Sequence, residues 1–177
     1  MKLQIRYIAL FLLLLWVLEA VNFLLGHSLI RYGILPRSPE GISGILFSPF
    51  IHAGFPHLVA NTAPLAILGS FVLVGGKKKF FSLTLFIILL SGVGVWAFGR
   101  EAYHVGASGL IFGYFGYLVS RGWYSGSFVS LVFSALTIFI YGGLIWGVLP
   151  ASPFVSWEGH LSGFLAGAAC AKFEEKK

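Results

Sequence analysis

Long apolar segments separated by short polar connections make up most of the chain. Six of them are candidates for membrane-spanning helices, which need about 20 mainly apolar residues. They cover about 7–25, 55–74, 80–98, 105–119, 128–149 and 157–173, and the fourth and sixth are short and begin with polar residues. The pattern predicts an all-α polytopic membrane protein, a bundle of six transmembrane helices in one domain over residues 1–177.

The first apolar segment lies where a secretory signal would lie. Its apolar stretch is too long for a signal peptide, and no clear small-residue cleavage site follows it. We therefore expect a retained span. The connection after it, residues 26–54, is long and carries three prolines as well as an apolar stretch from Ile42 to Phe50. We expect this first connection to be ordered and partly sunk in the outer leaflet.

Composition agrees with a membrane location. Hydrophobic residues make up 58% of the chain and charged residues 10%, whereas about a quarter of the residues in typical soluble domains are charged. The net charge of +6 does not indicate nucleic-acid binding, because the basic residues are sparse and lie between apolar segments. The expected surroundings are a lipid bilayer, with no nucleic acid as partner.

The distribution of lysine and arginine predicts the orientation, since these residues favour the cytoplasmic side. With six spans, one side holds only Arg31, Arg37 and Arg100. The other side holds nine basic residues: Lys2, Arg6, Lys77, Lys78, Lys79, Arg121, Lys172, Lys176 and Lys177. The count predicts a multi-pass protein of the cell (inner) membrane with both termini in the cytoplasm.

A polar residue begins each of the second, fourth and sixth spans. His57 begins the second, Ser108 begins the fourth within Gly106-Ala107-Ser108-Gly109, and His160 begins the sixth. These spans run in the same direction, so the three residues should lie at one depth near the outer face. Polar side chains within spans are costly and usually face the bundle interior or a watery cavity. We therefore expect the three to share a pocket.

This set of residues suggests a serine nucleophile. A serine needs a base to remove its proton, and histidine is the commonest one. A triad would add a carboxylate, but the chain contains no Asp, and Glu158 is only two residues before His160. Side chains at that helical spacing point apart. The prediction is a dyad of Ser108 and His160 without a carboxylate partner.

Donors for a developing oxyanion are also present. Asn61 follows His57 by four residues, which places both on one helical face. The backbone N–H of Ser108 would lie in the first turn of a helix, where N–H groups lack internal partners and the helix dipole favours negative charge. His57, Asn61 and this N–H could together form an oxyanion hole.

Glycines recur along the fourth and sixth spans. Small residues spaced three or four apart let helix backbones approach closely. The fourth span has Gly109, Gly113 and Gly116, and the sixth has Gly159, Gly163 and Gly167. We expect these two helices to pack tightly and bring Ser108 within hydrogen-bond reach of His160.

These motifs resemble those of the rhomboid intramembrane serine proteases, in their compact six-span prokaryotic form. The resemblance rests on His57-x-x-x-Asn61, on Gly106-x-Ser108-Gly109, and on His160 followed by Gly163 and Gly167. It implies a serine endopeptidase that cuts single-span membrane proteins near the outer membrane face and needs no metal or cofactor. In this family Ser108 would be the nucleophile and His160 the general base and acid. The fifth span and residues 150–157 would gate access.

Two positions depart from the family pattern. Many members have a Tyr four residues after the serine, stacked on the histidine, where this chain has Phe112. Phenylalanine can still stack there but lacks a hydroxyl. Some members carry a Trp-Arg pair in the first connection, and this chain has no Trp between Trp16 and Trp96. The departures concern loop contacts more than the chemistry.

Other interpretations remain open from the sequence. A non-enzymatic relative of the same fold typically lacks the serine or the histidine, whereas this chain keeps both, together with Asn61. A transporter commonly has acidic residues at mid-membrane; here Glu19 is the only acid well within an apolar segment, near its outer end, where it could cap or pair locally. A zinc protease is disfavoured because no His-Glu-x-x-His occurs. The single cysteine, Cys170, is a packing residue by default and a nucleophile in the alternative. His27, His52 and His104 are expected in loops with structural or interfacial roles.

Overall fold

The computed structural model describes residues 2–174, and over this range the fold is all-helical. Six long helices are α1 (Lys2–Leu24), α3 (Phe55–Val74), α4 (Lys77–Phe98), α5 (Ser108–Tyr124), α6 (Phe128–Tyr141) and α7 (Trp157–Glu174). The short helices are α2 (Gly44–Phe47) and the 3-10 helices η1 (Ser28–Tyr32), η2 (Pro39–Gly41), η3 (Ser48–Phe50) and η4 (Gly142–Val148). An isolated antiparallel bridge joins Ile34 to His104.

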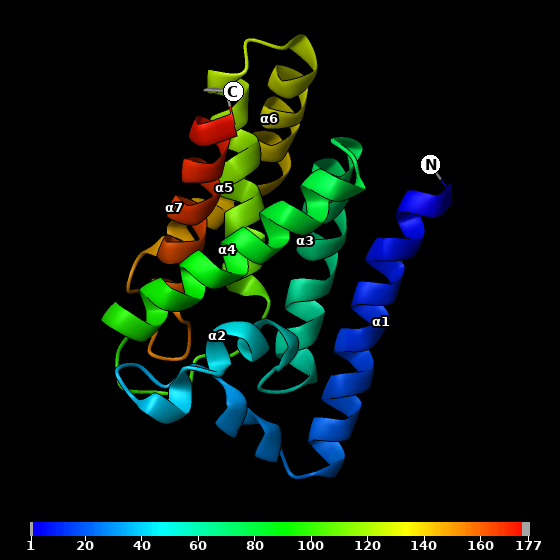
Figure 1. Cartoon of the computed structure of the whole chain (residues 1–177). Helices are drawn as coiled ribbons and strands as arrows, with labels where there is room; N and C mark the ends of the chain where they lie inside the picture. The colour runs from blue at the N-terminus through cyan, green and yellow to red at the C-terminus, as the bar shows by residue number, and fades with distance from the viewer. Residues whose placement is uncertain (1, 175–177) are drawn as a thin grey trace.

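Successive long helices alternate in direction. Figure 1 shows the two ends of the chain at the same end of the bundle, with α2 and the first connection at the opposite end. The α4–α5 and α6–α7 connections also lie away from the chain termini. The helices that begin at the far end are therefore α3, α5 and α7, as expected for the second, fourth and sixth apolar segments.

Four helical segments in the described residues are long and apolar enough to cross a membrane. They are Arg6–Leu24, Phe55–Val74, Lys77–Phe98 and Phe128–Val148. Large apolar side chains on their surfaces are exposed, among them Leu24 at 81% and Phe139 at 88%. Such wide apolar exposure suits hydrocarbon and not water. The chain is therefore a multi-pass membrane protein.

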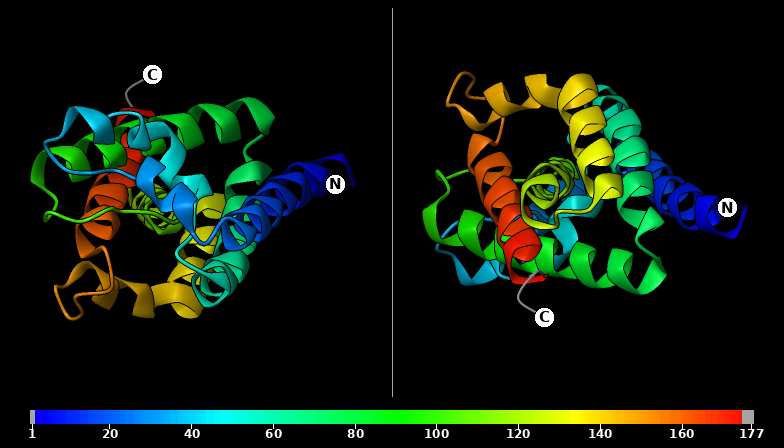
Figure 2. Two further views of the ribbon diagram at one scale, coloured as in Figure 1. Left: turned by 90° about the horizontal axis from the view of Figure 1, so that it is seen from below. Right: turned by 90° about the horizontal axis from the view of Figure 1, so that it is seen from above.

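The helices α5 and α7 fall outside this set. With 17 residues, α5 is at the short limit for a crossing, and its position adds a second reason. Figure 2 shows α5 near the middle of the bundle, with α3, α4, α6 and α7 around it. Its residues from Leu110 to Leu118 are all buried. A helix enclosed by protein need not present a long apolar surface to lipid, so hydropathy alone does not identify it.

Some element bounds differ from the predicted ones. The fourth helix begins at Ser108 and not near residue 105, because Gly106 has φ +115°, which is incompatible with a right-handed helix. The fifth segment is α-helical only to Tyr141 and continues as the 3-10 helix η4. The third begins at Lys77, so the lysine run forms the first turn of α4.

The helices α5 and α7 touch through their backbones. A Cβ atom added at Gly163 would lie 2.0 Å from the carbonyl oxygen of Gly109, and one added at Gly167 would lie 1.9 Å from that of Gly113. Any side chain larger than hydrogen would therefore push the helices apart. The close approach expected from the glycine spacing is present.

The end of α1 holds the first connection through buried polar groups. Asn22 Nδ2 donates to the carboxylate of Glu19 at 3.2 Å and to the carbonyl oxygen of His52 at 2.9 Å. Asn22 Oδ1 accepts from the backbone N–H of Leu29 at 3.0 Å. Both Glu19 and Asn22 are 1% exposed. Glu19 thus has a local structural partner, and the first connection is ordered.

Candidate active site

A cavity of about 430 Å³ brings the predicted site residues together. Its lining includes His57, Asn61, Ser108, Phe112 and His160. These side chains come from the starts of α3, α5 and α7, which lie at the same end of the bundle. Residues 153–156, just before α7, form another part of the wall.

The residues before Ser108 shape the start of α5. Gly106 has φ +115°, a backbone conformation that other residues rarely adopt. A Cβ at this position would also lie 2.5 Å from Cε1 of His57. Glycine is thus required both for the turn and for the approach of His57. The turn leaves Ser108 as the first residue of α5, where its N–H has no partner within the helix.

The ring of His160 is oriented by a backbone carbonyl. Its Nδ1 lies 2.8 Å from the carbonyl oxygen of Gly147, in η4. A carbonyl oxygen can only accept, so Nδ1 carries the proton and donates it. In the neutral ring Nε2 then holds the free lone pair, which is the state that a general base needs. No hydrogen bond joins Ser108 to His160 in the described part of the chain, although both line the same cavity.

Phe112 holds the same ring from its face. The centroids of Phe112 and His160 are 4.0 Å apart and the rings are inclined by 8°. The stacking contact that the sequence suggested is therefore formed without a hydroxyl. Gly147 lies beside both rings, since a Cβ there would be 2.7 Å from Cζ of Phe112 and 3.2 Å from Nδ1 of His160.

Glu158 contacts Arg100. Its Oε1 accepts from the backbone N–H of Arg100 at 3.2 Å and lies 3.5 Å from the guanidinium Nε. The side chain of Glu158 is 6% exposed. The carboxylate of Glu158 is thus engaged by Arg100, whereas Nδ1 of His160 faces the carbonyl of Gly147.

Two of the three candidate oxyanion donors, His57 and Asn61, lie on α3. Asn61 is 4% exposed, and its Nδ2 donates to the carbonyl oxygen of His57 at 2.8 Å. An amide nitrogen carries two protons, so the second remains for a ligand. Ser108, His57 and Asn61 all line the cavity.

His52 lies near the site, in the loop where the sequence analysis placed it with a structural or interfacial role. Its Nε2 accepts from the backbone N–H of Ala107 at 3.4 Å, and its ring packs edge-on against His57 with centroids 5.1 Å apart. Burial, together with the nearby His57, lowers the pKa of His52 to about 3, so the ring is neutral and can accept. His52 therefore supports both the turn before Ser108 and one candidate donor.

Cys170 lies far from this cavity. At about 1.5 Å of rise per residue, it is about 15 Å along α7 from His160. It lines a different cavity, near Lys79 and Glu174. The position gives no support to Cys170 as the nucleophile of this site. Among residues 2–174, no three His, Cys, Asp or Glu side chains are grouped to hold a metal ion.

Comparison with known proteins places the chain in a family. Residues 39–175 match the Rhomboid domain. The chain belongs to the rhomboid family. Its rhomboid domain includes every residue named above as lining the cavity, whereas α1 precedes the matched range.

Relatives of this rhomboid occur in mycobacteria and in a virus. Uncharacterized proteins of Mycobacterium tuberculosis and Mycobacterium bovis are 38% identical over 176 residues, which cover 91% of this chain and 71% of theirs. A protein of Acanthamoeba polyphaga mimivirus, whose name assigns it provisionally to the rhomboid proteins, is 35% identical over 133 residues. That match covers 71% of each chain.

Proposed function

We propose that this rhomboid is an intramembrane serine endopeptidase. Its substrates would be single-span membrane proteins, and its catalytic groups Ser108 and His160. The observation that carries the proposal is the hydrogen bond between Nδ1 of His160 and the carbonyl of Gly147, from which the tautomer with a free Nε2 follows. The free Nε2 is then available in a cavity that is also lined by Ser108, the first residue of α5, and by further donors.

The chemistry follows from these groups. Nε2 of His160 takes the proton of Ser108 Oγ as this oxygen bonds to the substrate carbonyl carbon. The oxyanion receives hydrogen bonds from the Ser108 N–H, from His57 and from Asn61. His160 then gives its proton to the leaving amine as the C–N bond breaks. A water molecule, deprotonated by His160, attacks the acyl group, and the proton returns to Ser108 as the acid product leaves.

The site supplies charge stabilisation and orientation. Removing one donor of an oxyanion hole costs about 2.7–4 kcal/mol in other serine proteases. Donors fixed in a cavity need no reorganisation when charge develops. Phe112 and Gly147 fix the ring of His160 before the substrate binds, which reduces the misalignment that slows proton transfer.

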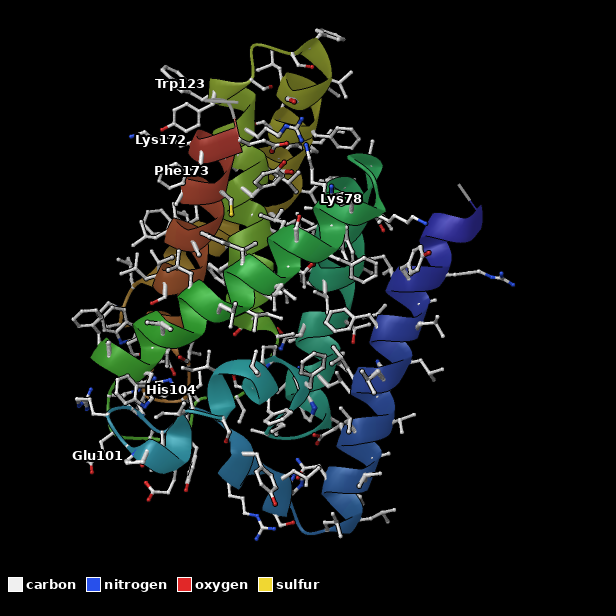
Figure 3. The ribbon with its side chains drawn as sticks, in the orientation of Figure 1. Lys78, Glu101, His104, Trp123, Lys172 and Phe173 are labelled. Atoms are coloured by element: carbon white, nitrogen blue, oxygen red, sulfur yellow. The ribbon has the colours of Figure 1, made fainter. Side chains whose placement is uncertain are left out.

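Six membrane crossings with cytoplasmic termini are part of the proposal. The alternating directions of the six long helices support it (Figure 1). Figure 3 labels Lys78 and Lys172 at the end of the bundle that carries the termini, and Glu101 and His104 at the opposite end. The counted Lys176 and Lys177 lie outside the described residues. Thiol-accessibility mapping, with cysteines introduced in a Cys170→Ala background, would overturn the orientation if residue 78 reacted from outside.

Substrate access is proposed at the end of the bundle that holds the cavity. In the first connection, Ile42, Leu46 and Phe47 are exposed, which suits insertion into the outer leaflet. Phe154, in the wall of the cavity, is 96% exposed. Part of the segment 150–157, together with the fifth span, would move to admit a substrate helix.

Labelling with a fluorophosphonate probe tests the function directly. The purified protein in detergent should become labelled at Ser108 and should cleave a model single-span substrate, with no effect of chelators. A non-enzymatic rhomboid would show neither labelling nor cleavage. The absence of labelling at Ser108, or the absence of cleavage, would by itself contradict the proposal. Cleavage that a chelator abolished would favour metal chemistry.

Substituting alanine for Gly147 should slow cleavage by about 100-fold, the order expected for a misplacement of about 1 Å. The added Cβ would contact Phe112 and His160 and displace the ring or the carbonyl that orients it. Gly143 is the matched control, because it lies in the same 3-10 helix and a Cβ there meets nothing within 4 Å. Initial rates of the two variants should differ, and equal rates would exclude an orienting role for Gly147.

A further inference from the structure

We propose that Arg100, His104, Ser156 and Glu158 form a loop clamp that holds His160 in position relative to Ser108. The clamp joins two connections, the one between α4 and α5 and the one between η4 and α7. All four are positioning residues in this proposal, because they act on the dyad through the backbone. The inference rests on the proposed function of the site.

The central bond of the loop clamp joins two residues that each lie four positions before a member of the dyad. His104 Nδ1 lies 2.6 Å from Ser156 Oγ. His104 precedes Ser108 by four residues, and Ser156 precedes His160 by four residues. The bond therefore ties together the two short segments that lead into the nucleophile and the base. Any change in its length shifts these segments relative to each other.

The proton positions along the clamp can be assigned. His104 Nε2 lies 3.0 Å from the carbonyl oxygen of Arg100, which can only accept, so this nitrogen carries the proton. Nδ1 is then an acceptor, and the hydroxyl of Ser156 donates to it. The same Oγ accepts from the N–H of Gly159 at 3.2 Å, inside the first turn of α7.

The chain of bonds ends on the backbone of the base itself. The carbonyl oxygen of Ser156 accepts from the N–H of His160 at 3.1 Å. His104 is in turn fixed to the first connection, since it exchanges backbone bonds with Ile34 at 2.9 and 3.0 Å. The clamp thus links the backbone of His160, through Ser156 and His104, to the first connection, which lies outside the α6–α7 segment.

A second attachment runs in parallel. Glu158 binds both the backbone N–H and the guanidinium of Arg100, and the guanidinium also donates to the carbonyl of Val155. The Glu158 side chain is 6% exposed and that of Arg100 is 35% exposed, so this partly buried ion pair is screened less than a surface pair. Residues 155–158 are therefore held at several points along the 100–104 connection.

This arrangement separates a moving part from a fixed part. The proposed route to the cavity runs past the segment around Phe154, whose side chain is 96% exposed. The loop clamp begins at Val155, the next residue. The substrate path can open before residue 155 while residues 156–160 stay in place. The clamp would thus keep the base aligned while the gate moves.

Two substitutions at position 104 test this proposal. In His104→Asn the side-chain amide reaches the position of Nδ1 and can accept from Ser156. In His104→Gln the amide reaches the position of Nε2 and retains only the local bond to Arg100. We expect His104→Gln and Ser156→Ala to lower kcat by about 10- to 100-fold with KM unchanged, as a small misplacement would. His104→Asn should restore most of kcat.

Glu101→Gln is the matched control. Glu101 lies in the same connection, and Figure 3 shows it at the outer edge of the molecule, with His104 nearer the helices. The kcat of the Glu101→Gln variant should equal that of the unsubstituted protein. Rates are expressed per site titrated with the fluorophosphonate probe, so that a loss of folded protein does not count as a loss of kcat.

The outcomes distinguish the two proposals. If the unsubstituted protein neither labels nor cleaves, the proposed function fails and the clamp with it. If it cleaves, and His104→Gln retains its kcat per titrated site, the loop clamp is wrong while the function stands. Equal losses in His104→Asn and His104→Gln, or a change in KM alone, would also overturn the clamp.

Discussion

Replacing Ser108 with alanine should abolish cleavage, and replacing His160 with alanine should do so to nearly the same extent. Without the hydroxyl no acyl-enzyme forms, and without the imidazole the hydroxyl keeps its proton. In serine proteases, loss of either group lowers kcat by about 10⁶-fold. We expect at least about 10⁴-fold here, since the oxyanion donors remain in both variants.

The combined variant sharpens this test. If Ser108 and His160 act as one unit, the double substitution should be no slower than Ser108→Ala alone. Ser70→Ala is a suitable control, because Ser70 is exposed on α3 and its hydroxyl donates to the carbonyl oxygen of Ala66 in its own helix. Cleavage of a model single-span substrate is measured by initial rates in detergent. Undiminished cleavage by Ser108→Ala would remove the serine from the mechanism.

Substituting alanine for Gly163 should separate α5 from α7 and lower both stability and activity. The new Cβ would lie 2.0 Å from the carbonyl oxygen of Gly109, so the backbones must move apart by more than 1 Å, roughly the displacement that costs 10²-fold in rate. Overpacking of this kind destabilises by about 1–3 kcal/mol. The thermal midpoint in detergent and kcat per titrated site should both fall.

Gly109→Ala provides the contrast in stability. The two glycines face each other across the same interface, but a Cβ at Gly109 would be 3.4 Å from the carbonyl oxygen of Gly159, an ordinary contact. Its thermal midpoint should stay near that of the unsubstituted protein. If Gly163→Ala and Gly109→Ala had equal midpoints, the spacing of the helices would not depend on backbone contact.

The depth of the site residues could be predicted because it depends on a local property. Crossing a bilayer takes about 20 apolar residues, so counting spans puts His57, Ser108 and His160 on one level. The structure brings all three to one cavity. The paired glycines of α5 and α7 were also readable, since small residues at helical spacing mark close packing.

The edges of elements were less predictable. The start of α5 depends on the backbone conformation of Gly106, which places Ser108 at the first turn. The enclosed position of α5 explains why its hydropathy is modest although it forms the centre of the bundle. The first property depends on backbone conformation and the second on neighbouring elements, so a hydropathy pattern alone identifies neither.

The sequence by itself determined the membrane location, the succession of apolar segments, the common level of the three polar residues and the membership of the rhomboid family. The tertiary structure alone decided which atoms meet: the carbonyl of Gly147 at Nδ1 of His160, His52 behind the turn at Ala107, and His104 against Ser156. The physical reason is that segment length and polarity are local properties of the chain. These bonds instead join residues more than 10 positions apart in the sequence, so they depend on the rotation of the helices and on how the loops pack. Gly147 contacts His160 through its backbone carbonyl, which every residue type has, so the residue type at this position does not predict the contact.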